Sequence, residues 1–271
     1  GKGYLICEGT LDADDFRVDK RAIDEATLAP QASYQLPVTT YLPTGGKGPF
    51  PTIIYGHGLA GDRHQGEQLA ELAAPQGYAT IAVDAVKHGQ HPDKPGALGA
   101  AASFFGLSLN LGDPVDSLAL RDHFRQSSYD KLQLLEMLRP GVDIDGDQKI
   151  DVGIDQLVYL GVSLGGIMSA EFLAFAPEVK VAMPIVPGAR VVDIIKDGKT
   201  FEPVIGFLKG ELGQVLILAD AAGQEHRVSK NDLDKDETQP MSLMPPVFGQ
   251  TLNEGDFVNL LGYLLTQSAA K

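Results

Sequence analysis

The sequence of 271 residues is 44% hydrophobic and 21% charged, with a formal net charge of −14 at pH 7. This length and composition are typical of a soluble globular protein that buries one large core. An acidic surface repels nucleic acids and anionic membranes, so neither is expected as a partner. The apolar runs are too short to span a membrane, and no charged-then-apolar leader opens the chain. The single cysteine excludes a disulfide within the chain.

The first third of the chain predicts short strands with turns over residues 1–50, followed by one helix and a further strand. Residues 34–42 have strand composition, and a turn rich in glycine and proline at 43–49 leads to a short buried strand at 51–55. A helical pattern then ends at 75–77, and the next buried strand occupies 79–83. Strand, helix and strand at this interval predict a βαβ unit and therefore a largely parallel sheet.

The middle of the chain predicts helices. Residues 96–112 are rich in Gly, Ala, Phe and Leu and lack a polar face, which fits a cap or acyl-binding segment as well as a buried helix. If the segment binds an acyl chain, Phe104 and Phe105 are its candidate contacts. From Arg121 an apolar stripe of helical period continues until Arg-Pro-Gly at 139–141 ends it.

The most informative motif is Gly-Val-Ser-Leu-Gly at 161–165, which lies between an apolar run at 157–160 and a helix-like stretch. A strand, a G-x-S-x-G motif and a helix are together the context of a nucleophile elbow. Glycines allow a turn sharp enough to hold the Ser163 hydroxyl clear of the backbone, and the amino end of the helix favours a developing oxyanion. We expect Ser163 to be a nucleophile; an ordinary strand-to-helix turn is the alternative. Further strands are expected at 179–186 and 214–220.

A second glycine-rich turn, at 56–59, follows the strand at 51–55. Hydrolases with a nucleophile elbow place half of an oxyanion hole in an upstream loop of this kind, and the groups needed are backbone N–H donors. We expect the backbones of Leu59 and Leu164 to supply these donors. His57 is expected beside the substrate as an orienting residue rather than as the base. A simple turn at the strand end is the alternative.

The general base and its acid are less clearly marked. In hydrolases with a nucleophile elbow the catalytic residues follow one another along the chain as serine, acid and histidine. His226 is the only histidine after Ser163. His226 is therefore the candidate base by elimination, with Asp193 or Asp220 as the carboxylate that orients it. The interval from Asp220 to His226 is short for the usual arrangement, and a surface position for His226 is the alternative.

An acidic loop at 143–151 carries the aspartates Asp143, Asp145, Asp147 and Asp151. Alternating carboxylates of a tight loop can converge on one centre, as calcium ligands do. Gly146 comes too early for an EF-hand loop, and Ile154 stands where that loop has its last acidic ligand. A loop of self-capping aspartates without an ion is the alternative. The predicted chemistry requires no cofactor, and a structural calcium is the one metal that the sequence suggests.

Several segments together resemble the catalytic domain of bacterial virulence-factor-type lipases, which are α/β-hydrolase esterases. These segments are Arg121-Asp-His-Phe-Arg-Gln126, Leu132-Gln-Leu-Leu135, Pro140-Gly-Val-Asp-Ile-Asp-Gly-Asp147, Tyr159-Leu-Gly-Val-Ser-Leu-Gly-Gly-Ile167 and Tyr55-Gly-His-Gly58. The resemblance covers about residues 34–210. It implies an α/β-hydrolase fold with a mostly parallel central sheet flanked by helices, and a nucleophile at Ser163 with an oxyanion hole at Leu59 and Leu164. Ester substrates and an extracytoplasmic location are also implied.

The end of the chain departs from this resemblance, because the family's Gly-x-x-Asp acid and later histidine are not recognisable. Residues 214–271 resemble instead the C-terminal segment of planctomycete-type haem-associated proteins. They contain no Cys-x-x-Cys-His motif, so no haem is expected. We predict an α/β-hydrolase core at 1–213 and an atypical segment at 214–271 that packs on the same domain.

Together these features predict a serine carboxylesterase that hydrolyses short- to medium-chain acyl esters through an acyl-enzyme. One alternative is a non-catalytic binding module of the same fold that has lost its acid and histidine. Another is a hydrolase of amides or lactones that uses the same elbow. The expected partner is a small-molecule ester, and the formation of a homo-oligomer is left open.

Overall fold

The computed structural model describes residues 2–97, 99–107 and 115–188, and the backbone of two strands at 215–219 and 225–229. The chain divides into two compact units, Gly1–Leu212 and Gly213–Lys271. In the second unit, β9 (Val215–Ala219) pairs antiparallel with β10 (Glu225–Ser229). The expected strand at 214–220 is thus found as β9, whereas β10 was not expected.

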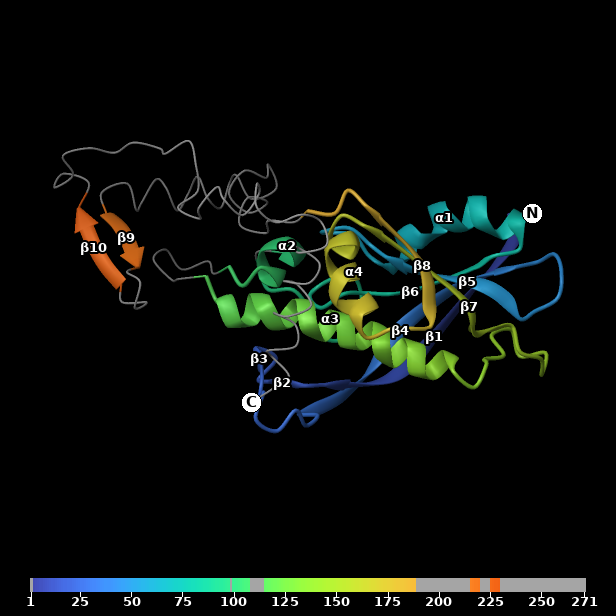
Figure 1. Ribbon diagram of the computed structural model, residues 1–271, viewed down its shortest axis with the longest axis horizontal. Helices are drawn as coiled ribbons and strands as arrows, with labels where there is room; N and C mark the ends of the chain where they lie inside the picture. The colour runs from blue at the N-terminus through green and yellow to red at the C-terminus, as the bar shows by residue number, and fades with distance from the viewer. Residues whose placement is uncertain (1, 98, 108–114, 189–214, 220–224, 230–271) are drawn as a thin grey trace, which may run out of the picture. The chain divides into compact units, whose positions relative to one another are not determined.

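The first unit is built on a six-stranded sheet with the order β1-β4-β6-β5-β7-β8 (Figure 1). Its strands are β1 (Tyr4–Asp15), β4 (Ala32–Pro43), β5 (Phe50–Gly56), β6 (Ala79–Val83), β7 (Val152–Val162) and β8 (Val179–Ile185). Strands β5 to β8 run parallel to one another, whereas β4 pairs antiparallel with both β1 and β6. The expectation of a largely parallel sheet is therefore confirmed.

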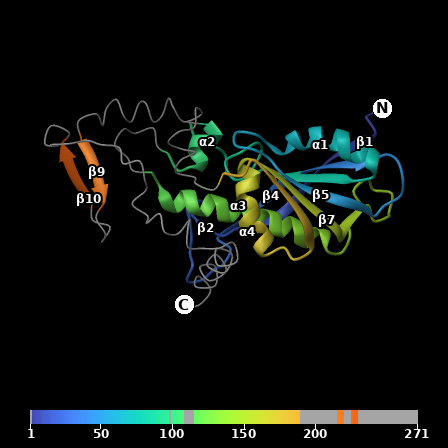
Figure 2. The ribbon, with the colours of Figure 1, turned by 45° about the horizontal axis from the view of Figure 1, so that its top comes forward.

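Helices cover both faces of this sheet. Helix α1 (Gly66–Ala73) lies along one face, and α3 (Ser117–Leu138) and α4 (Leu164–Ala174) lie along the other (Figures 1 and 2). The shorter elements are β2 (Arg17–Val18), β3 (Ala22–Ile23), η1 (Arg63–Gln65), η2 (Ala74–Gln76) and α2 (Gly99–Phe104). This arrangement is the fold class expected from the sequence, an α/β fold with a mostly parallel central sheet flanked by helices. Of the helices in the described residues, none is long and apolar enough to cross a membrane.

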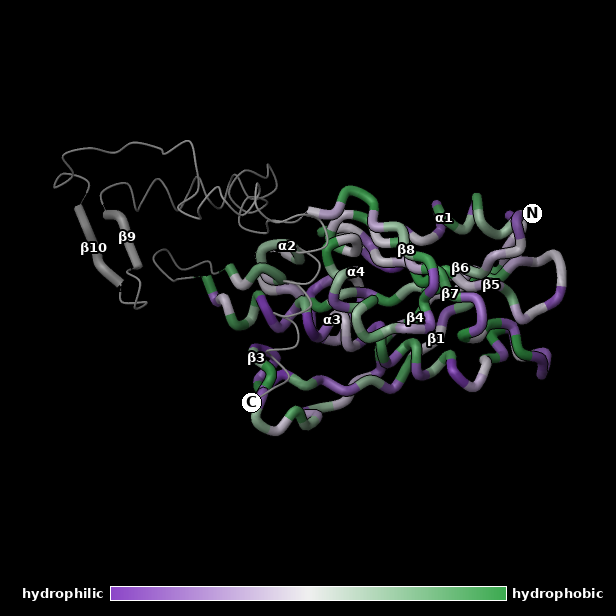
Figure 3. Tube along the Cα trace, in the orientation of Figure 1, coloured by the Kyte–Doolittle hydropathy of each residue, from purple (hydrophilic) through white to green (hydrophobic). Residues whose placement is uncertain are grey.

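The core lies between the sheet and its helices. Central parallel strands are covered on both faces, so their sequences are nearly continuous apolar runs, as in β6, where all five residues are buried. Figure 3 shows green stretches in this central part of the sheet. Ile54 in β5, Ile81 in β6 and Tyr159 in β7 are completely buried. Leu134 of α3 and Phe172 of α4 pack into the same core cluster. The helical stripe predicted for the middle of the chain is therefore the core-facing side of α3.

The main surprise is β1. Only short strands were expected before residue 50, but β1 has 12 residues and pairs with β4 from Tyr4 opposite Pro43 to Asp15 opposite Ala32. Within the described residues β1 is an edge strand of its sheet. Edge strands carry charges and glycine that weaken the strand pattern in sequence, and β1 contains Glu8, Gly9 and several aspartates.

Candidate functional site

The candidate site lies where the turns after β5 and β7 meet. From β5 the chain continues to β6 on one side, and β7 later pairs with the other side of β5. Gly56, the last residue of β5, is opposite Gly161 of β7, so both strands end at the same edge of the sheet. In α/β sheets ligands bind outside the carboxyl ends of the strands, where the direction of the chain's progress reverses in this way.

Ser163 occupies a strained turn at this edge. Its φ of 51° and ψ of −108° lie outside the regions that ordinary side chains favour. The N–H of Ser163 donates to the carbonyl of Ile185 in β8 at 2.9 Å, and its own carbonyl accepts from the N–H of Ile167 in α4 at 2.9 Å. Strain of this kind persists only where the surroundings hold it, and it is concentrated at functional sites.

The flanking glycines are required by close backbone contacts. A Cβ on Gly165 would clash with the carbonyl group of Gly56, and a Cβ on Gly161 would clash with the carbonyl group of Gly165. The hydroxyl of Tyr159 donates to the carbonyl of Gly165 at 2.7 Å and fixes the start of α4 against β7. The G-x-S-x-G spacing is therefore explained by packing on both sides of the serine.

The turn after β5 passes beside the serine. A Cβ built on Gly58 would lie 3.7 Å from the Cβ of Ser163. Among the described residues we find no acceptor for the backbone N–H of Leu59 or of Leu164. N–H groups in the first turn of a helix have no partner within the helix. This applies to Leu164, the first residue of α4, whereas Leu59 lies in the turn after β5.

His57 is buried rather than presented to a substrate. Its ring is 2% exposed, Nδ1–H donates to the carbonyl of Gly58 at 2.8 Å, and Nε2 accepts from the N–H of Ala85 at 2.9 Å. Burial lowers the pKa of His57 to about 4, so the ring is neutral at pH 7. With both ring nitrogens engaged, His57 holds the turn after β5 against the turn after β6.

The rings of Phe104 and Phe105 are also core residues, at 0% and 1% exposure. Phe104 contacts the rings of His88 and Phe124 edge-on, with centroids 5.4 Å and 4.9 Å away. Neither phenylalanine ring is open to an acyl chain in this arrangement, which corrects the expectation that they line the site. An apolar segment without a polar face indicates burial, but it does not distinguish a cavity wall from a core.

The structure leaves the base and acid unplaced. Asp193 and Asp220 lie outside the described residues, and for His226 only the backbone in β10 is described. In the described part of the chain no histidine side chain hydrogen-bonds to Ser163.

A buried histidine–carboxylate pair was missed by sequence reasoning. His91 Nε2 donates to Asp130 at 3.1 Å, and both side chains are completely buried. The Nδ1 atom of His91 accepts from the backbone N–H of Asp93, so the ring joins loop and helix rather than serving a nucleophile. The two residues are far apart in sequence, and no local motif marks them.

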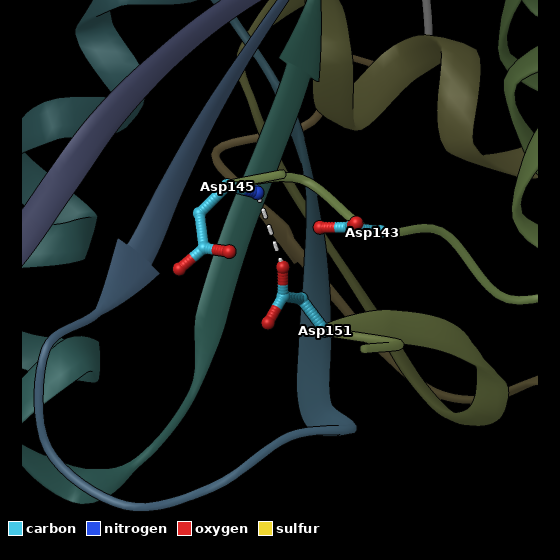
Figure 4. A group of neighbouring side chains, drawn as sticks. All are labelled: Asp143, Asp145 and Asp151. Atoms are coloured by element: carbon cyan, nitrogen blue, oxygen red, sulfur yellow. Dashed lines mark hydrogen bonds between the residues drawn. The ribbon is translucent and has the colours of Figure 1, made fainter. Parts of the chain in front are cut away.

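The acidic loop brings three of its four aspartates close together. Asp143, Asp145 and Asp151 each offer a carboxylate oxygen within 4.8 Å of the others (Figure 4). The same carboxylates accept hydrogen bonds from backbone N–H groups of the loop, as self-capping aspartates do. Asp147 instead pairs with Lys149 and is not one of the three. The donor set suits a hard cation only in part, because calcium takes six or more oxygens.

Comparisons with models of protein families and with curated proteins found no match. Among solved structures, an acetyl xylan esterase from Paenibacillus sp. R4 is 17% identical with a TM-score of 0.44, over 76% of this chain and 62% of that chain. Acetyl xylan esterase 1 from Thermoanaerobacterium sp. is 20% identical with a TM-score of 0.41, over 65% and 52%. A dienelactone hydrolase-like promiscuous phosphotriesterase from metagenomic libraries is 15% identical with a TM-score of 0.41, over 68% and 60%. The chain thus spans about half to three fifths of these proteins, and the likeness concerns the fold alone.

Proposed function

We propose that this protein is a serine hydrolase, and more narrowly a carboxylesterase that cleaves short- to medium-chain acyl esters. The observation that carries the proposal is the positive φ of Ser163 in a turn whose two flanking glycines pack backbone against backbone. An ordinary strand-to-helix turn has no need of a strained serine. The resemblance of the sequence to virulence-factor-type lipases supports ester substrates over amides.

The proposed reaction starts with attack of Ser163 Oγ on the ester carbonyl. The N–H groups of Leu59 and Leu164 donate hydrogen bonds to the negatively charged oxygen of the tetrahedral intermediate. Collapse of this intermediate releases the alcohol and leaves an acyl-enzyme. Water then hydrolyses the acyl-enzyme to the carboxylic acid and free serine. We assign the proton transfers to His226, oriented by Asp193 or Asp220.

The decisive experiment measures hydrolysis of p-nitrophenyl acetate, butyrate, octanoate and laurate by the wild type and Ser163→Ala. The wild type should hydrolyse the short and medium esters, and Ser163→Ala should lose at least a thousandfold of that activity, as removal of a nucleophile does. Ser169→Ala is the matched control, because this serine is buried in α4 and its Oγ donates to the carbonyl of Gly166. The control should keep most of the activity.

A covalent label makes the assignment independent of the ester chosen. A fluorophosphonate should add to the peptide that contains Ser163 in the wild type and in Ser169→Ala, and mass spectrometry should find no such adduct in Ser163→Ala. His226→Ala should lose ester hydrolysis while staying folded if His226 is the base. A wild type inert to the esters and to the label would overturn the proposal and favour a binding module.

A further inference from the structure

One lysine of α3 is buried without an ion-pair partner among the described residues. The Lys131 side chain is almost completely buried, its Nζ donates to the carbonyl of Ser127 at 3.0 Å, and Nζ lies 3.9 Å from the Sδ of Met168. Within the described residues, no ion pair is formed by this ammonium. Burying an ammonium without a counter-ion costs several kcal/mol, and one carbonyl does not account for that cost.

Lys131 lies next to the cluster that holds both proposed oxyanion donors. The side chains of Leu59, Leu164 and Met168 pack together in one apolar cluster. Nζ of Lys131 contacts this cluster at Met168. Met168 is one helical turn beyond Leu164, a rise of about 6 Å, which puts the ammonium on the order of 10 Å from an oxygen bound at Leu164. At that distance a positive charge acts on the oxygen through the protein interior.

Asp130 and Glu171 act on the charge of Lys131 from a distance, and neither forms an ion pair with it among the described residues. On α3, the carboxylate of Asp130 is engaged by Tyr34, Gln126 and His91. On α4, Glu171 accepts from the hydroxyl of Ser128 at 3.1 Å, and burial raises the pKa of Glu171.

The turns after β5 and β6 add His57 and His88. Burial is the main cause that lowers the pKa of each, and the charge of Lys131 lowers it further. His57 belongs to the same turn as Leu59 and precedes it by two residues.

We propose that Lys131 is an electrostatic positioning residue of the esterase site, whose buried ammonium stabilises the negative charge that develops on the substrate oxygen between Leu59 and Leu164. The proposal rests on the proposed function. Lys131 touches no reacting atom and acts only through its field. A unit charge about 10 Å away at an effective dielectric constant of about 20 changes the rate roughly tenfold.

The proposal also predicts a pH dependence. Burial lowers the pKa of Lys131 to about 8, with Asp130 and Glu171 opposing the shift. The ammonium is therefore mostly charged at pH 7 and loses its proton just above neutrality. Its contribution to the rate should fade as the pH rises through about 8, so kcat should decline there even after the uncatalysed hydrolysis is subtracted.

The test compares the wild type with Lys131→Met, which keeps the length and contacts of the side chain but removes the charge. For p-nitrophenyl butyrate at pH 7, kcat should fall about tenfold while KM stays within twofold, and the decline of kcat above pH 8 should disappear. A purely structural role would not remove that decline. Lys180→Met is the matched control, because Lys180 is exposed and its Nζ donates to the carbonyl of Pro177.

Glu171→Gln provides a second readout that does not depend on the stability of Lys131→Met. Because the charge of Glu171 raises the pKa of Lys131, its removal should move the decline of kcat to lower pH. If the wild type is active and Lys131→Met has the same kcat and the same pH dependence of kcat, the Lys131 proposal alone is overturned. The same holds if the decline of kcat in Glu171→Gln occurs at the same pH as in the wild type. A wild type that neither hydrolyses the ester nor reacts with a fluorophosphonate overturns the proposed function and, with it, the role of Lys131.

Discussion

The backbone N–H of Gly165 donates a hydrogen bond of 3.0 Å to the carbonyl of His57, and this bond joins the turn after β7 to the turn after β5. The imidazole of His57 extends the connection to Ala85, in the turn after β6. His57 therefore links the three turns at the edge of the sheet where Ser163 lies. The proposed nucleophile and the proposed oxyanion donor at Leu59 are held relative to each other by backbone groups rather than by flexible side chains.

Replacing His57 by leucine should destabilise the protein by about 2 kcal/mol, because the buried N–H of Ala85 loses its acceptor. Urea denaturation measures this change. The exposed His64 offers the matched substitution His64→Leu, which should change the free energy of unfolding by less than about 0.5 kcal/mol. Equal effects of the two substitutions would contradict the linking role of His57.

Gly165→Ala should destabilise the protein by about 2 kcal/mol or more and reduce ester hydrolysis, because the added methyl group meets the backbone of Gly56. Gly9→Ala is the control, since nothing lies within 4 Å of a Cβ at that position. Thermal unfolding should separate the two variants clearly. A Gly165→Ala variant as stable as Gly9→Ala would refute the packing explanation of the motif.

Ser163→Gly should be more stable than Ser163→Ala by about 1 kcal/mol, although both variants lose the hydroxyl. Glycine adopts a positive φ without strain, whereas alanine keeps the strain of the serine. The comparison of the two free energies of unfolding measures the backbone strain directly. Equal stabilities would mean that the turn is relaxed.

The free energy of unfolding should fall as the pH is lowered from about 6.5 to about 4. Burial lowers the pKa values of His57 and His123 from 6.5 to about 4. Between these values the unfolded chain binds more protons than the folded chain, so acid favours unfolding by up to about 3 kcal/mol for each histidine. Above pH 6.5 both histidines are neutral in the folded and in the unfolded chain, so this contribution to the free energy of unfolding is fully present. Urea denaturation at pH 7.5 and at pH 5 measures this difference in the free energy of unfolding. The difference should be smaller in His123→Leu.

If the acidic loop binds calcium, the melting temperature should rise by several degrees when the ion is added after treatment with EDTA, because a ligand that binds only the folded state stabilises it. Asp145→Asn should abolish the rise, since Asp145 is one of the three convergent carboxylates. Magnesium serves as the comparison ion and should have a smaller effect. Identical melting curves with and without calcium would favour the loop of self-capping aspartates.

The sequence predicted the parts of the structure that depend on local rules. The elbow motif was recognisable because the residues that carry it, from Gly161 to Gly165, are contiguous in the sequence, although the close contact that excludes a side chain at Gly165 is with Gly56 of another strand. The strand at 79–83 was predicted at its observed bounds because a doubly covered strand is continuously apolar.

Features set by tertiary contacts were not predictable in the same way. The bond from Ala85 to His57 and the pair of His91 with Asp130 depend on which strands become neighbours. The burial of Phe104 likewise follows from its packing against α3 and His88 rather than from its own segment.

The order of the strands has a consequence for how the protein folds. The hairpin of β1 and β4 joins residues between about 20 and 40 positions apart, whereas Ile53 of β5 pairs with Val158 of β7, about 100 positions later. Closing the longer loop costs more chain entropy, and pairings between distant segments slow folding. The edge hairpin should therefore form early and the pairing of β5 with β7 late. The strained turn of Ser163 should then be completed only after most of the sheet is in place, so partly folded chains should carry the serine without its positive φ.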